Sequence, residues 1–176
     1  CAARPMPQRS FRCYRGFMSL TPPEPTPTGS GEEAHFRALE SLYRAAPINR
    51  LFESDIAITG PGQCDIVFDV DERYFHAAGA VHGSSYFKML DDAAFYAVNS
   101  LVTDRFVLTT AFNLLFTKPI KPGRLRASGR WLSGRKRVYV AEATLIDGDG
   151  EEAGRGTGTF MRSHIPLAGL PGYKSA

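Results

Sequence analysis

The chain has 176 residues, which is enough for one domain with a real core and too few for two of ordinary size. Hydrophobic residues make up 43% and charged residues 22%, and no apolar run approaches the roughly 18 residues that cross a bilayer. The net charge of +3 depends on four arginines in the first 20 residues, and without them 17 basic residues face 18 acidic ones. The composition therefore excludes a membrane span and gives no bulk basicity for binding nucleic acid.

The cysteines indicate neither a disulfide framework nor a metal site. Cys1, Cys13 and Cys64 form no CxxC pair and no cluster with histidine at metal-ligand spacing. A reducing compartment suits such a chain best. We therefore predict a cytoplasmic protein that uses no metal and no cofactor.

The start of the chain has the composition of a disordered leader or linker. Residues 1–31 are rich in Pro, Ser, Thr, Gly and Arg and show no hydrophobic periodicity. Their Arg-rich, acid-free beginning suits an organelle import signal, whereas TPPEPTPTGSG equally suits an ordinary leader that begins at Met18. We predict a leader over residues 1–31, a folded domain over 32–165 and a tail over 166–176.

The first half of the domain alternates between helical and strand-like patterns. Apolar residues recur at helical spacing over residues 32–46, and Pro47 ends this pattern. Alternating runs on either side of a Gly-Pro-Gly turn predict strands over residues 56–58 and 64–70. The long run AVHGSSYFKMLDDAAFYAVNS then predicts a helix over residues 84–101.

The second half of the domain consists of strand-like runs, over residues 106–117, 125–133, 137–146 and 152–162. Short segments, KPIKPG, SGRK and DGDG, separate them and are typical of tight connections. We therefore expect consecutive antiparallel neighbours. The predicted fold class is α+β, with an antiparallel sheet packed on one long helix.

Two adjacent aspartates lie in the middle of the long apolar helix. At helical spacing Asp91 shares a face with Phe87 and Phe95, whereas Asp92 follows Lys88 by four residues and should pair with it at the surface, in contact with solvent. A carboxylate against a core is costly unless its pKa rises or it finds a partner. Asp91 is thus either a functional carboxylate or a group at the helix rim that caps a backbone amide.

The start of the same helix reads HGSS, residues 82–85. Amides at a helix start are unpaired and lie at the positive end of the helix dipole, so they suit an oxyanion that approaches over Gly83. A plain serine cap after a glycine turn is the alternative. Gly83 and Asp91 are eight residues apart, roughly 12 Å along a helix. If both act on one carbonyl, the site must therefore join two protomers.

The helix motif, with Asp nine positions after the His, resembles that of the PaaI-like acyl-CoA thioesterases of the hotdog fold. The later run from Asn113 to GTGTF strengthens this resemblance, which covers roughly residues 35–165. It implies a sheet wrapped around one long central helix and hydrolysis of acyl-CoA to a free acid and CoA. It also implies a homodimer as the active unit, within a homotetramer, and no cofactor other than the CoA of the substrate.

Roles for site residues follow from the resemblance. In that family the amide after the motif His polarises the thioester carbonyl, which assigns this role to Gly83. The acidic residue corresponds to Asp91, as general base on water or as nucleophile, and His82 corresponds to the His that orients the substrate. Thr109 falls where some relatives have a hydroxyl residue beside the carboxylate, suited to holding the attacking water.

The chain departs from the family motif at two positions. Ser84 replaces the second glycine of the usual HGG and would tighten the entrance, and His76 stands where some members have Asn. These departures keep two other functions open on the same fold. One is a non-catalytic acyl-CoA-binding or sensing protein, and the other is an enoyl-CoA hydratase or dehydratase that uses His76 with Asp91.

Other residues are candidates for binding the substrate. Basic side chains at strand ends suit the phosphates of CoA, although they are more often a solvated sheet edge. The best of them lie in one turn, Arg135, Lys136 and Arg137, and the others are Lys118, Lys121, Arg124 and Arg126. Asn113 is assigned to the substrate site. Four aromatic side chains are candidates for lining the acyl pocket, although such side chains more often belong to the core. They are Phe87, Phe95, Phe112 and Phe116.

Overall fold

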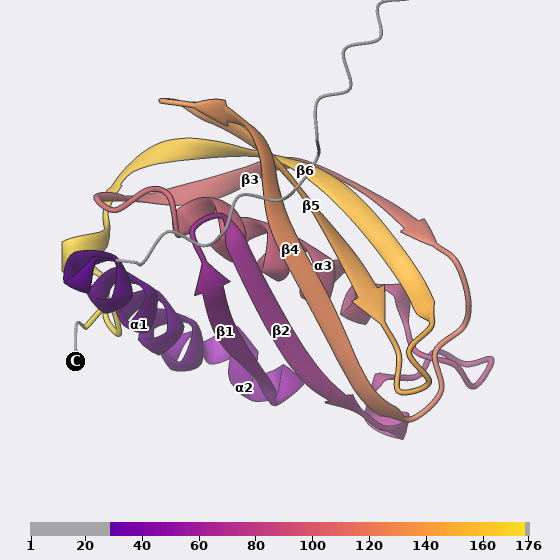
Figure 1. Ribbon diagram of the computed structural model, residues 1–176. Coiled ribbons are helices and arrows are strands. Elements are labelled where there is room, and N and C mark those ends of the chain that lie inside the picture. Colours follow the sequence, from indigo (N-terminus) through magenta and orange to yellow (C-terminus); the bar gives the residue numbers. More distant parts are fainter. Residues whose placement is uncertain (1–28, 175–176) are drawn as a thin grey trace, which may run out of the picture.

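A computed structural model describes residues 29–174 and shows an antiparallel sheet that curves around one long helix (Figure 1). The predicted α+β class is confirmed, and the predicted leader lies outside the described residues up to residue 28. None of the described helices is both long and apolar enough to cross a bilayer. The elements are α1 Ser30–Ala45, α2 Pro47–Phe52, β1 Ser54–Gly60, β2 Gln63–Val70, α3 Gly83–Asn99, β3 Arg105–Phe116, β4 Gly123–Arg135, β5 Val138–Ile146 and β6 Glu152–Pro166.

The strand order is β1-β2-β4-β5-β6-β3, and all neighbours are antiparallel. The expectation of consecutive neighbours is right for β4, β5 and β6 but wrong for β3, which pairs with β6 and not with β4. The β3–β4 connection contains Pro119 and Pro122, which lack a backbone amide for a hairpin ladder. Its Ile120 is buried, and the carbonyl of Lys118 accepts the Tyr86 hydroxyl at 2.8 Å. The connection is therefore a packed crossover beside α3, which leaves β3 at the edge of the sheet.

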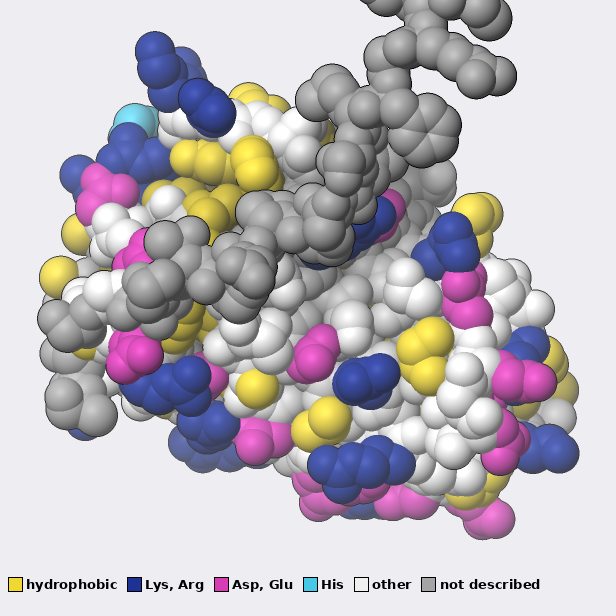
Figure 2. Space-filling model, viewed as in Figure 1, with side chains coloured by type: hydrophobic (Ala, Val, Ile, Leu, Met, Phe, Trp, Pro, Cys, Tyr) yellow, Lys and Arg dark blue, Asp and Glu magenta, His cyan; other side chains and the backbone are white. Residues whose placement is uncertain are grey.

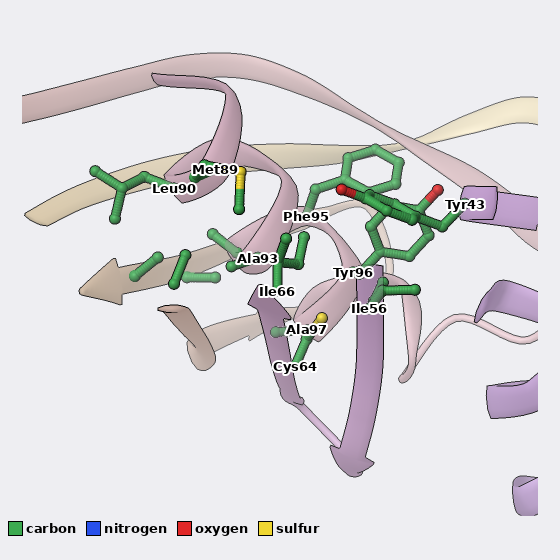
Figure 3. Packing of buried hydrophobic residues seen from close by; sticks show 14 of the residues in the cluster. Tyr43, Ile56, Cys64, Ile66, Met89, Leu90, Ala93, Phe95, Tyr96 and Ala97 are labelled. Carbon is green, nitrogen blue, oxygen red and sulfur yellow. The ribbon is translucent and has the colours of Figure 1, made fainter. Parts of the chain in front are cut away.

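Helix α3 packs tightly on the inner face of the sheet. Its fully buried residues include Met89, Ala93 and Ala97, and Figure 3 shows this face of the helix beside side chains of β1 and β2. The closest approach is to β4, where a Cβ on Gly129 would lie 2.1 Å from the carbonyl oxygen of Ala93. Only glycine permits this contact. Because the sheet holds this face of α3, Asp91 is directed away from the sheet centre, toward the edge.

Helix α2 is an element that the periodicity does not predict. Pro47 ends α1, as expected, but it also begins a second helix, where its missing amide needs no intrahelical partner. The helix has six residues and ends at Glu53 in the left-handed conformation, with φ 50°. Its last residue, Phe52, packs against the rings of Phe68 and Tyr74. The far end of α2 is thus fixed by aromatic contacts.

The described end of the chain packs against the domain. Leu167 is fully buried in a short 3-10 turn, and the Tyr173 hydroxyl lies 2.7 Å from His35 Nδ1. His35 Nε2 donates to the carbonyl of Asn99 at 3.0 Å, so Nδ1 accepts from Tyr173. These contacts join α1, the end of α3 and residues 167–173. The division between domain and tail at residue 166 stays a prediction.

Candidate active site

Asp91 and Thr109 meet at the edge of the sheet. Asp91 lies in the middle of α3, and Thr109 lies on β3 and donates from Oγ1 to Asp91 Oδ1 at 3.0 Å. Both residues are half-buried. They border a cavity of about 290 Å³, whose other walls are mainly apolar and include Ala46, Ile48, Phe95, Tyr96, Phe106 and Leu108. Asp92 and Asn49 also border this cavity, so two carboxyl groups, a hydroxyl group and an amide group lie among mainly apolar walls.

The surroundings of Asp91 favour its protonated form. Burial raises the pKa of Asp91 from 3.8 to about 6, and the charge of Asp92 adds to the rise. The hydrogen bond from Thr109 and the ammonium group of Lys88 act in the opposite direction. A carboxyl group that titrates near neutral pH is well suited to proton transfer.

Asp92 pairs with Lys88, as predicted, but the prediction that this pair is solvated is wrong. The side chains of Lys88 and Asp92 are only 13% and 20% exposed. The Lys88 ammonium also donates to Asn49 Oδ1 at 2.6 Å and lies 5.2 Å from the ring centre of Tyr43. Tyr43 belongs to α1 and Asn49 to α2. These two helices cover the pair, and spacing along α3 alone carries no information about them.

The first amide of α3, that of Gly83, has no hydrogen-bond partner in the described part of the chain. His82 caps the helix, because its Nδ1 accepts from the Ser84 amide at 3.1 Å and lies 2.8 Å from the Ser84 hydroxyl. A neutral His82 ring therefore carries its proton on Nε2. The Ser85 amide donates to the His82 carbonyl at 3.0 Å, whereas the Gly83 amide has no acceptor among residues 29–174. Gly83 is the residue to which the resemblance assigns the oxyanion contact.

His76 and Gly83 border a second cavity, of about 420 Å³. The ring of Phe116 lies over Gly83, since a Cβ added there would be 3.1 Å from Phe116 Cζ. His76 is exposed, and its Nδ1 accepts from the amide of Ala78 at 3.0 Å. The predicted oxyanion donor and His76 thus share one space at the start of α3.

The two cavities have no lining residue in common. Asp91 and Thr109 border one, and Gly83 and His76 border the other, in line with the spacing of Asp91 and Gly83 along α3. Within one protomer, Asp91 therefore lies beside Thr109, and Gly83 shares a cavity with His76, but these two pairs of residues do not meet. The pairing of His76 with Asp91 that a hydratase would use is likewise not formed within one protomer.

The predicted phosphate-binding residues fall into two groups. Lys118 and Arg124 each pair with carboxylates of neighbouring strands and loops. The others are exposed and take part in no ion pair with the described part of the chain; they are Lys121, Arg126 and the three neighbours Arg135, Lys136 and Arg137. Arg135, Lys136 and Arg137 lie at the end of β4 and in the turn that follows it, and Figure 2 shows Lys and Arg side chains gathered over that end of the strand. The three cations at this turn can therefore bind an anion without breaking an ion pair.

Phe87 and Asn113 border neither cavity. Phe87 is 44% exposed on α3, and its ring meets that of Phe112 edge-on at 5.6 Å. Asn113 is exposed on β3. Within the protomer both side chains are thus open to contact from outside, along the same edge of the sheet.

The contacts around Lys88 are the part of the site that sequence reasoning missed. Asn49 is buried, and its Nδ2 donates to the carbonyl of Tyr43 at 2.6 Å. The one available signal was a lysine among the apolar residues of the long helix, because a buried cation requires polar partners. No local pattern indicated that a partner would come from the segment after Pro47.

Comparisons with known proteins point to one fold. A model of the thioesterase superfamily matches residues 78–153. The solved structure of the E. coli PaaI protein, from the phenylacetic acid degradation operon, superimposes with a TM-score of 0.71 at 18% identity, over 77% of this chain and 97% of that one. A thioesterase family protein from Silicibacter pomeroyi gives 0.67 at 24% identity, over 72% and 96%.

A curated relative extends the likeness to the sequence level. A protein of Saccharolobus solfataricus that is named as an esterase is 28% identical over 100 residues, which are 57% of this chain and 67% of the relative. The segment matched by the superfamily model contains Gly83, Asp91, Thr109 and the turn after β4. Both cavities are therefore bordered by residues of the matched segment.

Proposed function

We propose that this chain, a hotdog protein that resembles the PaaI-like thioesterases, hydrolyses an acyl-CoA thioester to a free acid and CoA. The observation that carries the proposal is the half-buried Asp91, whose pKa is raised to about 6 and whose carboxylate accepts the Thr109 hydroxyl. Binding alone needs no such carboxylate beside an apolar cavity. Activation of water, or nucleophilic attack, does.

The reaction needs a base or nucleophile and a donor for the developing oxyanion. In the first route, ionised Asp91 removes a proton from a water held by Thr109, and the water oxygen attacks the thioester carbonyl. In the second, the Asp91 carboxylate attacks directly and forms an anhydride that water then hydrolyses. In both, the Gly83 amide stabilises the negative carbonyl oxygen. The carbonyl then re-forms, the C–S bond breaks, and CoA leaves as its thiolate.

The free edge of β3 supports a site that two protomers share. Among the described strands β3 pairs only with β6, so the backbone groups on its other edge lack a partner strand. Leu108, Leu115 and Phe116 on this strand are 45%, 57% and 59% exposed. Pairing of two β3 strands about a two-fold axis would cover this edge and would bring Asp91 of one protomer toward Gly83 of the other. The proposed active unit is this homodimer, within a homotetramer.

The proposed site for the CoA phosphates is the turn of Arg135, Lys136 and Arg137. Its three cations are exposed and take part in no ion pair with residues 29–174. Guanidinium groups bind phosphate through two parallel hydrogen bonds, and lysine adds a point charge. Phe87 and Asn113 remain candidates for contacts with the substrate at the protomer edge.

Two parallel assays separate hydrolysis from the alternatives. The protein is incubated with saturated and 2-enoyl CoA esters, graded by chain length and aromaticity, and free thiol and the double bond are followed separately. A thioesterase releases thiol from saturated esters. A hydratase removes the double bond without releasing thiol, and a binding protein does neither, so each outcome identifies one function.

The role of Asp91 is tested by Asp91→Asn. We expect turnover to fall by roughly 100-fold or more while ester binding persists, because the change removes the base or nucleophile and keeps the side chain's shape. Asp69→Asn is the matched control, since this carboxylate lies on the exposed surface of β2 with a side chain that is 71% exposed. Turnover that survives in Asp91→Asn, in a protein that hydrolyses esters, contradicts the assignment.

A further inference from the structure

The half-buried ammonium group of Lys88 joins α2 to the helix that carries Asp91. We propose that Asn49 and Lys88, together the Asn49–Lys88 clamp, hold the first turn of α2 as a wall of the Asp91 cavity and so determine which acyl groups enter. This inference rests on the proposed function for its substrate. The clamp residues position the wall and take no part in the chemistry.

Lys88 is held on several sides. Its ammonium donates to Asn49 Oδ1 at 2.6 Å and to the carboxylate of Asp92, and it lies 5.2 Å and 5.5 Å from the ring centres of Tyr43 and Phe52. The side chain is only 13% exposed. A cation that is largely shielded from water loses part of its hydration, so each of these contacts helps to keep it in place. Loss of Asn49 would leave Lys88 without its hydrogen bond to α2.

Asn49 is the polar anchor of α2. It is 7% exposed and is the only buried residue in this helix. Its Oδ1 accepts from Lys88, and its Nδ2 donates to the carbonyl of Tyr43 at 2.6 Å. One side chain therefore ties α2 to both α1 and α3. A helix of six residues is not stable by itself, so its position depends on such contacts.

The first turn of α2 faces the candidate catalytic carboxyl group. Ala46, Ile48 and Asn49 line one side of the cavity of about 290 Å³ that Asp91 and Thr109 also border. Phe52 fixes the other end of α2 through its ring contacts, so the clamp acts at the end next to the cavity. Movement of this turn would change the width of the cavity without changing the hydrogen bond between Thr109 and Asp91.

The clamp predicts a change in selectivity. In Asn49→Ala we expect the ratio of kcat/KM for a bulky acyl-CoA to kcat/KM for a short one to rise at least fivefold, mainly through KM, because the wall loosens and also loses the Asn49 side chain that borders the cavity. This ratio does not depend on the fraction of active protein, so partial unfolding cannot imitate the effect. Asn49→Ser is the milder variant if Asn49→Ala does not fold. A ratio within twofold of wild type overturns the proposal.

The matched control lies on the same helix. Leu51 is 68% exposed and borders neither cavity, so Leu51→Ala should leave the ratio unchanged. A similar shift in both variants would mean that any weakening of α2 has this effect, and it would overturn the role of the clamp.

A second readout is independent of hydrolysis. Hydrogen exchange of the amides in residues 48–52 should become at least tenfold faster in Asn49→Ala and stay unchanged in Leu51→Ala. Unchanged exchange in Asn49→Ala overturns the clamp. If the wild-type protein hydrolyses no ester, the proposed function fails, and the ratio of dissociation constants for the same two esters replaces the kinetic ratio as the test of the clamp.

Discussion

At the scale of single residues, the adjacent carboxylates Asp91 and Asp92 differ because their neighbours differ. Asp91 meets a hydroxyl group and an apolar cavity, and its pKa rises to about 6. Asp92 meets the ammonium group of Lys88, which opposes the effect of burial on its pKa. A rotation of about 100° along one helix is enough to separate a carboxyl group that can exchange protons from one that pairs with the ammonium group of Lys88.

The raised pKa of Asp91 predicts an acid limit to activity. The deprotonated carboxylate is the active form, so kcat/KM should rise with pH through about 6 and level off above it. The Thr109 hydrogen bond stabilises this form and lowers the pKa of Asp91, so Thr109→Val should move the midpoint to higher pH. Thr109→Ser keeps the hydroxyl group and should restore the wild-type midpoint. A midpoint in Thr109→Val that stays in place or moves down would rule out this effect.

At the scale of elements, three segments meet at the buried ring of His35. This residue lies on α1, donates to the end of α3 and accepts from Tyr173 near the C-terminus. Burial lowers the pKa of His35, although the hydrogen bond to Asn99 opposes this effect. The ring is therefore neutral in the folded protein at a pH where a free histidine is already charged.

His35 predicts a loss of stability in acid. The unfolded chain takes up a proton at the ordinary histidine pKa of about 6.5, whereas folded His35 does so only at lower pH, so its contribution is complete above 6.5 and is lost as pH falls. Urea unfolding at pH 7.5 and 5.5, at one protein concentration, should show that the difference in free energy of unfolding between wild type and His35→Gln is smaller at pH 5.5. The raised pKa of Asp91 makes its contribution to the free energy of unfolding larger in acid, but this contribution is the same in wild type and in His35→Gln and cancels in the difference. If the difference in free energy of unfolding between the two proteins is the same at both pH values, His35 is not held neutral by burial.

At the scale of the whole molecule, the protomer holds two incomplete halves of one proposed site. The cavity at Asp91 and the cavity at Gly83 lie beside the same edge strand, β3, but share no residue. The exposed apolar side chains of β3 lie on this edge. The proposed dimer accounts for both features at once, because it covers the edge and joins one half from each protomer.

Mixing two inactive variants tests the shared site. Asp91→Asn removes the carboxylate, and Gly83→Val crowds the oxyanion site at the start of α3, because a Cβ on Gly83 would already lie 3.1 Å from the Phe116 ring. A mixed dimer has one site with both defects and one with neither. Random re-pairing of equal amounts makes about half the dimers mixed, so activity should recover to about a quarter of wild type. Each variant must first be shown to dimerise. Well-folded, exchanging mixtures that stay inactive would exclude a site that joins the two protomers.

Local spacing was enough to predict most elements and the pairing of Asp92 with Lys88. The period of apolar residues predicted α1, α3 and all six strands to within a few residues, because helical and extended backbones repeat at different intervals. The same period indicated which face of α3 carries Asp91 and that Asp92 pairs with Lys88. The resemblance to the PaaI-like hotdog proteins led to the confirmed fold, and the structure places Thr109 at Asp91.

Only the tertiary structure decided features that depend on residues far apart in the chain. The position of β3 beside β6 results from long-range strand pairing and a packed crossover at Ile120, whereas turn composition alone suggested simple neighbours. The burial of the Lys88–Asp92 pair results from α1 and α2, which the spacing of α3 cannot reveal. Side-chain periodicity specifies the direction in which a residue points, but burial depends on what the rest of the chain places there.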